Sequence, residues 1–254
     1  MSAGAMPEAG ASPLDTRGLT LVVTDKPDVE RDALAAAWAD AGGHVLRLGR
    51  FWEPPPLEAS RVRVYGADSY CQVLAQKLGL ELISPDDDLV LRLPPRLLGR
   101  VVGASTLDSA AALTYPVFLK TLVPKLIRSR VYASADELAA GARGLPDDTA
   151  LMASEVVAFT AEVRCWVLEG EVLTLACYEG EADEPALEAA RKLAAEAAGD
   201  AAVPSPCVLD LGFVAGRGWV VIEANAAWGA GLNGCDPAAA ARCVARASRT
   251  AAPS

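Results

Sequence analysis

The stretch CVLDLGFVAGRGWVVIEANAAWGAG, residues 207–231, constrains the fold of this chain more than any other part of the sequence. Two apolar runs lie on either side of AGRG, and each has the character of a buried strand. Gly216-Arg217 has the Gly-X pattern of a two-residue turn between antiparallel strands. A turn at that place pairs Ala215 with Gly218, so the sequence predicts a β-hairpin with a defined register.

Three side chains that carry oxygen atoms meet on one face of this predicted hairpin. Counting outward from the turn sets Asp210 opposite Glu223, and Asn225 follows on the same face because side chains alternate along a strand. Opposed carboxylates about 5 Å apart repel by roughly 3 kcal/mol at an effective dielectric of about 20. A hard cation such as Mg²⁺ would neutralise them and leave coordination positions for phosphate and water. The alternative is that Arg217 or Arg164 pairs with the acids, or that one acid is solvated at a strand end.

Length and composition limit the classes of protein to which this chain can belong. Its 254 residues suffice for one large domain or two modest ones, and its 52% hydrophobic and 22% charged residues are typical of a soluble globular protein. A net charge of −10 argues against a nucleic-acid partner, because such proteins present a basic surface. No apolar run approaches the roughly 18 residues that a membrane span needs, so we expect no membrane partner either.

Targeting and redox features favour a cytoplasmic protein. Residues 1–17 have neither the basic start nor the apolar centre of a secretory signal, and we interpret them as a flexible tail. The six cysteines form no CxxC pair and fall mostly inside apolar segments. This pattern is typical of reduced, buried thiols.

Residues 18–105 are predicted to form a small α/β domain. The strand-like runs LTLVVT, HVLRLG and RVRVYG alternate with helical patterns, which predicts a mainly parallel sheet. The segment contains no GxGxxG motif, so nothing in it indicates a dinucleotide-binding domain. ISPDDDLVLRLPPRLLGR then predicts an irregular connection followed by a helix.

From Thr106 onward strands follow one another along the chain, which predicts a mostly antiparallel second sheet. TLDSAAAL indicates a short helix capped by Thr106, and SADELAAGARGL carries a Ser134-x-x-Glu137 capping box. A hairpin is expected to turn at Glu169-Gly170, and DEPALEAARKLAAEAAG has the clearest helical pattern of the chain. The last helix is expected in DPAAAARCVARASR, with Asp236 as its cap.

A lysine and a cationic loop follow one of these strands. Lys120 closes the apolar run VFLK, a position where a lysine is ordinarily just a solvated end residue. Lys125, Arg128 and Arg130 come shortly afterwards. Such a cluster of cations is suited to a polyphosphate.

The order and spacing of these pieces resemble the ATP-grasp superfamily of carboxylate–amine ligases over about residues 90–250. The chain looks most like the clade named for two arginines and a lysine, which is echoed by LRLPPRLLGR, YPVFLKTL, EVVAFTAEVR and VIEANAAWGAG. The resemblance implies an α+β ATP-grasp domain whose two lobes, residues 106–154 and 155–254, sandwich a nucleotide. It also implies that residues 18–105 are a small Rossmann-like α/β pre-ATP-grasp domain.

The resemblance further implies which residues would hold ATP and Mg²⁺. Lys120 would contact the phosphates, and Glu162 would accept the ribose hydroxyls. The segment Glu155-Val156-Val157 would be the hinge between the lobes, holding adenine through its backbone. One or two Mg²⁺ ions bridging the β- and γ-phosphates would be held by Asp210, Glu223 and Asn225.

Two arginines would complete the implied catalytic set. Arg164 matches one arginine of the clade and would sit near the transferred phosphate or the acyl phosphate. Arg100 is our candidate for the other, with Arg96 and Arg92 as rivals.

The sequence departs from many ATP-grasp proteins at two places. Residues 121–130 contain no glycine, whereas many relatives have a glycine-rich phosphate loop. Lys125 and Arg128 would substitute charge for backbone donors in that loop. Val208 stands where many relatives carry a basic residue, and we expect Arg164 to supply that charge.

The implied activity is ATP- and Mg²⁺-dependent joining of a carboxylate to an amine through an acyl phosphate, on a small molecule, a peptide or an amino acid. The alternatives are a nucleotide-binding module without ligase activity, which the glycine-free loop favours, and a phosphotransferase on the same fold. The sequence leaves open the identity of both substrates and the oligomeric state, a homodimer included.

Overall fold

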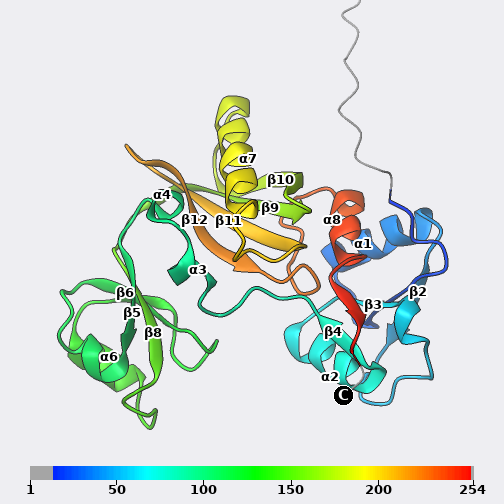
Figure 1. Cartoon of the computed structure of the whole chain (residues 1–254), viewed down its shortest axis with the longest axis horizontal. Coiled ribbons are helices and arrows are strands. Elements are labelled where there is room, and N and C mark those ends of the chain that lie inside the picture. The colour runs from blue at the N-terminus through cyan, green and yellow to red at the C-terminus, as the bar shows by residue number, and fades with distance from the viewer. Residues whose placement is uncertain (1–13, 253–254) are drawn as a thin grey trace, which may run out of the picture.

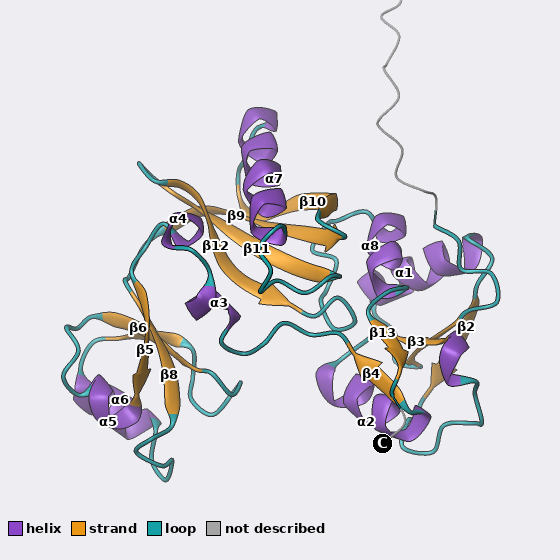
Figure 2. Ribbon diagram, in the orientation of Figure 1, coloured by secondary structure: helices purple, strands orange, loops and turns teal. Residues whose placement is uncertain are grey.

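The computed structural model describes residues 14–252 and arranges them as three units side by side along the long axis of the molecule (Figure 1). Most of the expected tail, residues 1–13, lies outside the described residues. Each unit combines a β-sheet with helices packed on it, as the ribbon in Figure 2 shows. We name the units the α/β unit, the first lobe and the second lobe.

The α/β unit contains the parallel sheet that the sequence predicts. Its strands have the order β2-β1-β3, and β1 pairs in parallel with both neighbours. The carboxylate of Asp28 caps the first helix by accepting a hydrogen bond from the backbone N–H of Arg31 at 2.9 Å. The elements are β1 (Thr20–Thr24), α1 (Val29–Asp40), β2 (His44–Leu48), the 3-10 turn η1 (Ala59–Arg61), β3 (Val62–Val64) and α2 (Asp68–Leu78).

The end of the chain returns to the α/β unit, which the sequence did not indicate. The helix α8 (Pro237–Val244), capped by Asp236 as predicted, packs against α1, and β13 (Ser248–Thr250) pairs antiparallel with β4 (Leu80–Leu82). Side chains from both ends of the chain therefore share one hydrophobic core. Figure 1 shows the red C-terminal elements beside the blue and cyan ones.

The first lobe is an antiparallel sheet with the strand order β5-β8-β6-β7. Its first strand crosses the domain boundary that we expected between residues 105 and 106. In its second helix Ser134 Oγ accepts from Glu137 N, but the Glu137 carboxylate accepts from Ala133 N, so only half of the capping box forms. The elements are β5 (Val102–Thr106), α5 (Leu107–Ala110), β6 (Val117–Thr121), β7 (Arg130–Tyr132), α6 (Ala135–Gly141) and β8 (Ala150–Ser154).

The second lobe is an antiparallel sheet with the strand order β10-β9-β11-β12. The long helix α7 covers one face and contributes three fully buried alanines to the core beneath it. Trp166 and Val208 belong instead to the core of the α/β unit, so the opposite face is covered as well. The elements are α3 (Leu89–Arg92), α4 (Pro95–Leu98), β9 (Phe159–Leu168), β10 (Glu171–Gly180), α7 (Glu184–Ala198), β11 (Cys207–Val214) and β12 (Gly218–Asn225).

The hairpin of β11 and β12 has the expected pairing of acids but not the expected turn. Gly218 pairs with Val214 rather than Ala215, so the loop is one residue longer than the two-residue turn we predicted. An irregularity at Ile222 then restores the count, and Asp210 lies opposite Glu223. A longer loop and a β-bulge therefore compensate for each other.

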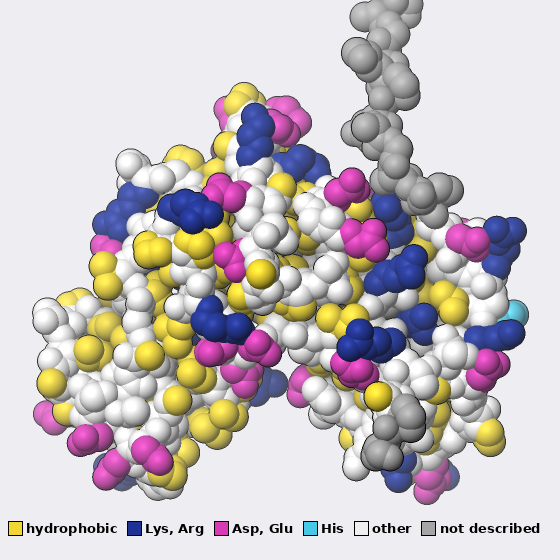
Figure 3. Space-filling model, viewed as in Figure 1, with side chains coloured by type: hydrophobic (Ala, Val, Ile, Leu, Met, Phe, Trp, Pro, Cys, Tyr) yellow, Lys and Arg dark blue, Asp and Glu magenta, His cyan; other side chains and the backbone are white. Residues whose placement is uncertain are grey.

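Charged side chains of both signs lie on the described surface. Basic and acidic side chains are interspersed over the face shown in Figure 3, with no continuous basic patch there. Within residues 14–252, no helix combines the length and apolar character needed to cross a membrane. All six cysteines are unpaired, and five of them are buried.

Candidate active site

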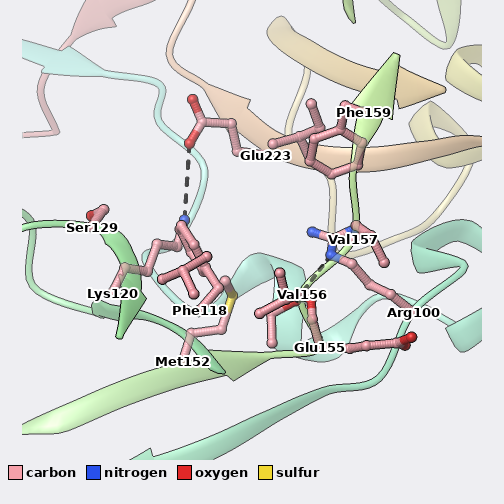
Figure 4. Close-up of a pocket in the computed structure, with 13 residues that line it drawn as sticks. Arg100, Phe118, Lys120, Ser129, Met152, Glu155, Val156, Val157, Phe159 and Glu223 are labelled. Atoms are coloured by element: carbon pink, nitrogen blue, oxygen red, sulfur yellow. Dashed lines mark hydrogen bonds and ion pairs between the residues drawn. The ribbon is translucent and has the colours of Figure 1, made fainter. Parts of the chain in front are cut away.

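An apolar cavity of about 170 Å³ lies where the two lobes and the segment between them meet. Phe118 and Met152 from the first lobe and Phe159 and Ile222 from the second form part of its wall. Figure 4 shows Phe118, Met152 and Phe159 around the connecting segment 155–157. The cavity has the size and lining to accept a flat aromatic group.

A second, more polar cavity of about 280 Å³ shares Lys120, Ser129 and Glu223 with the first. Its lining adds charged side chains, including Asp87 and Lys125. The two cavities therefore adjoin at Lys120 and Glu223, where an apolar compartment opens into a charged one. Such a pair of compartments suits a ligand with an aromatic end and an ionic end.

Lys120 faces this junction because of its place on β6. The strand alternates buried and partly exposed residues, so Leu119 enters the lobe core while Phe118 and Lys120 face the cavity. The Lys120 Nζ atom lies 3.9 Å from Glu223 Oε2, at the limit of an ion pair. Lys120 is therefore a cation with a loosely held partner.

Asp210 is held by an arginine, as one of the sequence alternatives proposed. Arg164 Nε and Nη2 donate to the two carboxylate oxygens of Asp210 at 2.8 and 2.7 Å, and Arg164 Nη1 donates to the carbonyl of Gly231 at 3.0 Å. Burial raises the pKa of Asp210, whose side chain is 3% exposed, and the Arg164 pair opposes that rise. All three guanidinium nitrogens of Arg164 are thus engaged.

Asn225 bridges the two opposed acids. Its Nδ2 atom lies 3.1 Å from Asp210 Oδ2 and 3.3 Å from Glu223 Oε1, so it donates to both carboxylates. Among the described residues no three His, Cys, Asp or Glu side chains form a metal-binding group. The set that fits a hard cation is two carboxylates plus an amide, and half a turn of the Asn225 amide would present its oxygen in place of the nitrogen.

Glu155 joins the connecting segment to the hairpin of the second lobe. Arg217 donates to both oxygens of the Glu155 carboxylate at 2.7 and 3.1 Å, and Val101 N donates to it at 3.1 Å. In the described chain the backbone groups of Val156 and Val157 make no backbone hydrogen bonds. Both residues line the apolar cavity, where unpaired backbone groups can bind the polar edge of a ligand.

The Glu155 ion pair gives a pH-dependent prediction. The Arg217 guanidinium, followed by the Val101 N–H, lowers the pKa of Glu155 from 4.5 to about 2. Because the pKa is lowered in the folded state, the stabilisation is complete above about pH 4.5 and is lost as the pH falls toward 2. Glu155→Gln should therefore lower Tm more at pH 7 than at pH 3 in thermal unfolding. Equal losses at both pH values would refute the role of charge, and the exposed Glu171→Gln serves as control.

Of the other expected site residues, some line the two cavities and some do not. Lys125 lines the polar cavity, but Arg128 is not among the residues that line either cavity. Glu162 accepts a hydrogen bond from the Tyr178 hydroxyl at 2.6 Å and does not line either cavity. Arg130 forms an ion pair with Glu137, so its charge is not part of the expected cationic cluster.

The three arginines that compete for the second catalytic place are separated by the structure. Arg92 pairs with Asp86 and Asp88, and Arg96 pairs with Glu196 of α7. Arg100 alone of the three lines the apolar cavity. It lies on the side opposite Lys120, beside Val157 (Figure 4).

Sequence reasoning missed most of the cavity wall. Phe118 could have been inferred, because it lies two residues from Lys120 on the same strand face. Met152, Phe159 and Ser129 carry no such signal. The loop after Lys120 contains no glycine, yet Lys125 adopts the left-handed conformation that glycine favours, with φ of 69°. The sequence did not indicate this conformation.

Comparison with known proteins decides the family. Residues 97–243 match the model of an ATP-grasp domain, that of the second family in the clade named for two arginines and a lysine. The chain belongs to this ATP-grasp family. The match covers more than half of the chain, including both strands of the acid-bearing hairpin and Lys120. No curated protein matches.

Solved structures show the same ATP-grasp fold at low sequence identity. The RimK domain ATP-grasp protein from Sphaerobacter thermophilus is 16% identical, with a TM-score of 0.53 over 81% of this chain and 90% of that one. N5-carboxyaminoimidazole synthase from Aspergillus clavatus, solved with ADP and 5-aminoimidazole ribonucleotide, is 14% identical, with a TM-score of 0.59 over 90% and 77%. L-amino acid ligase from Bacillus licheniformis is 13% identical, with a TM-score of 0.53 over 85% and 67%.

Proposed function

We propose that this ATP-grasp protein is an ATP- and Mg²⁺-dependent ligase that joins a carboxylate to an amine. The observation that carries the proposal is the pair of adjoining cavities, one apolar and one charged, which meet at Lys120 and Glu223. ATP has the matching division into an aromatic base and a polyphosphate. The names of the structural relatives, which include an amino acid ligase, support the same reaction class.

The apolar cavity would take the adenine base. Phe118, Met152 and Phe159 supply apolar surface on which a flat ring can pack. The free backbone groups of Val156 and Val157 would bind the polar edge of the base. Lys120, at the far side of this cavity, would then contact the phosphates.

Asp210, Glu223 and Asn225 would hold Mg²⁺. The ion would neutralise phosphate charge as it develops and orient the transferred phosphoryl group. Asp210 has about four lone-pair sites on its carboxylate, and three hydrogen bonds from Arg164 and Asn225 occupy most of them. Turning the Asn225 amide would free one of those sites. Arg164 would hold the Asp210 carboxylate in one orientation rather than touch the phosphate itself.

The reaction would proceed in two steps, phosphoryl transfer to the carboxylate and then amide formation. A substrate carboxylate oxygen attacks the γ-phosphorus of ATP, ADP leaves, and an acyl phosphate forms. An amine nitrogen then attacks the acyl carbon, inorganic phosphate leaves, and the nitrogen loses a proton as the amide forms. Lys125, which lines the charged cavity, would lie near the phosphates during the first step.

A specific observation favours the alternative of a nucleotide-binding module without ligase activity. Asp210 is already clamped by Arg164, and Lys125 takes a glycine-like conformation in a loop without glycine. Such a module would bind ATP without turning it over. A phosphotransferase would instead leave a stable phosphorylated product and no amide.

Measurement of ADP release tests the proposal. The purified chain is incubated with ATP, Mg²⁺ and pools of amino acids or peptides, and products are identified by mass spectrometry. We expect ADP release that requires both an acid and an amine, an amide of the combined mass, and loss of activity with a metal chelator. ATP-dependent thermal stabilisation without ADP release from any pool would contradict the ligase and support the binding module.

A further inference from the structure

A second cation lies in the apolar cavity, on the side away from Lys120. Arg100, between α4 and β5, lines this cavity and points its guanidinium toward the space between Val157 and Phe159 (Figure 4). Its Cζ atom is 5.8 Å from the centroid of the Phe159 ring. The cavity therefore has a cation at each side, and the phosphate end is the one that Glu223 and Lys120 mark.

Hydrogen bonds within the protein engage only some of the N–H donors of the Arg100 guanidinium. Its Nε donates to Ser154 Oγ at 3.1 Å, and its Nη1 donates to the carbonyls of Leu98 at 3.0 Å and Val221 at 2.8 Å. These bonds fix the plane of the group. Its Nη2 makes no hydrogen bond with any residue of the described chain, and because Arg100 lines the cavity, these N–H donors are open to a ligand.

Arg100 also has no carboxylate partner among the described residues. The nearest candidate, Glu155, is bound by Arg217 instead. Burial lowers the pKa of Arg100, and the charge of Glu155 opposes that shift. The Glu155 charge acts on Arg100 without a direct ion pair, so the partly buried guanidinium is compensated only in part, and a purely structural donor pair could be supplied by a neutral group. The position therefore suits a ligand that accepts hydrogen bonds from Nη2.

We infer that Arg100 recognises the nucleobase, with Nη2 donating to a ring nitrogen of a purine held between the hinge and the Phe159 ring. The inference rests on the proposed ATP site and differs from the expectation that Arg100 lies at the transferred phosphate. Purines present ring nitrogens as acceptors, and the arginine fork is well suited to them. Both purines present a ring-nitrogen acceptor, so Arg100 selects purines, and the hinge backbone distinguishes adenine from guanine.

Binding of nucleotide analogues tests this role without a known substrate. Dissociation constants of ATP and of 1-deaza-, 3-deaza- and 7-deaza-ATP are measured by calorimetry for the wild type, Arg100→Met and the control Arg96→Met. Arg96 lies four residues away and pairs with Glu196 outside the cavity. In the wild type one deaza analogue should bind about tenfold more weakly than ATP, because a hydrogen bond to a charged donor is lost.

The deciding measurement is whether the Arg100→Met substitution removes the difference in affinity between ATP and the weakly bound analogue. Arg100→Met should bind ATP about tenfold more weakly and should no longer distinguish that analogue from ATP, whereas Arg96→Met should behave as wild type. The same penalty should appear for the corresponding deaza-adenosine, which has no phosphates. If Arg100→Met does not fold, Arg100→Lys and the wild-type adenosine series carry the test.

Three outcomes would overturn the inference while leaving the ATP site intact. The first is equal binding of all three analogues and ATP to the wild type. The second is an Arg100→Met variant that still distinguishes the analogue from ATP. The third is a variant that loses turnover with unchanged dissociation constants, which would place Arg100 at the reacting phosphate. Failure of the wild type to bind ATP at all would instead refute the proposed function on which the inference rests.

Discussion

Glu223→Gln is expected to lower ADP release sharply without weakening the fold. The proposed metal site has only two carboxylates, so removal of one charge should cost several kcal/mol of transition-state stabilisation. At 1.36 kcal/mol for each factor of ten, turnover should fall about 10²-fold or more. Mg²⁺ should also be needed at higher concentration. The measurement is ADP release across a Mg²⁺ titration.

The thermal stability of Glu223→Gln, unlike its turnover, should not fall. The Glu223 side chain is 43% exposed and pairs with no arginine among the described residues, while Asp210 lies directly opposite. Glutamine keeps the shape and removes the like charge, so Tm without nucleotide should stay the same or rise. Glu171→Gln, an exposed substitution in the same lobe, should change neither quantity. Undiminished ADP release by Glu223→Gln would remove Glu223 from the mechanism.

The hairpin of β11 and β12 shows which structural features a local sequence pattern can predict. Period-two alternation fixed the face of Asp210 and Asn225, and the Gly-X pair indicated a turn at nearly the right place. The bulge at Ile222 has no sequence signature, yet without it Asp210 would face a different residue. The predicted pairing was therefore correct although the predicted turn was one residue too short.

Contacts between distant segments were beyond prediction from sequence. The pairing of β13 with β4 joins two short strands with little hydrophobic pattern, and only the tertiary fold brings them together. The cavity wall is assembled in the same way from Met152, Phe159 and Arg100, which come from separate elements. The arginine that binds Asp210 was an open alternative, because a register alone does not fix where a long side chain turns.

Arg164→Met is expected to be the most destabilising single substitution at the site. It would leave the Asp210 carboxylate, only 3% exposed, without its bidentate partner. Removing one member of a buried pair typically costs about 3–5 kcal/mol. For a chain of this size each kcal/mol lowers Tm by roughly 2–4 °C, so a fall of about 6–20 °C is expected in thermal unfolding.

Asp210→Asn should cost less than Arg164→Met, because Arg164 keeps its bond to the Gly231 carbonyl and its side chain reaches more solvent, at 13% exposure. The double variant should then recover much of the stability lost in Arg164→Met, with a coupling energy of about 2–3 kcal/mol. Additive losses in chemical denaturation would contradict the buried pair.

The double variant also separates structure from chemistry. Two neutral side chains can fill the space of a buried ion pair at little cost, so a stable fold alone does not require Arg164 and Asp210. We expect the double variant to be folded, to bind adenosine as the wild type does, and to release no ADP. That combination would mean that the pair is present for the phosphate end of the site, with Arg164 orienting the carboxylate that Mg²⁺ needs. Activity retained in the double variant would shift the metal-binding role to Glu223 and Asn225 alone.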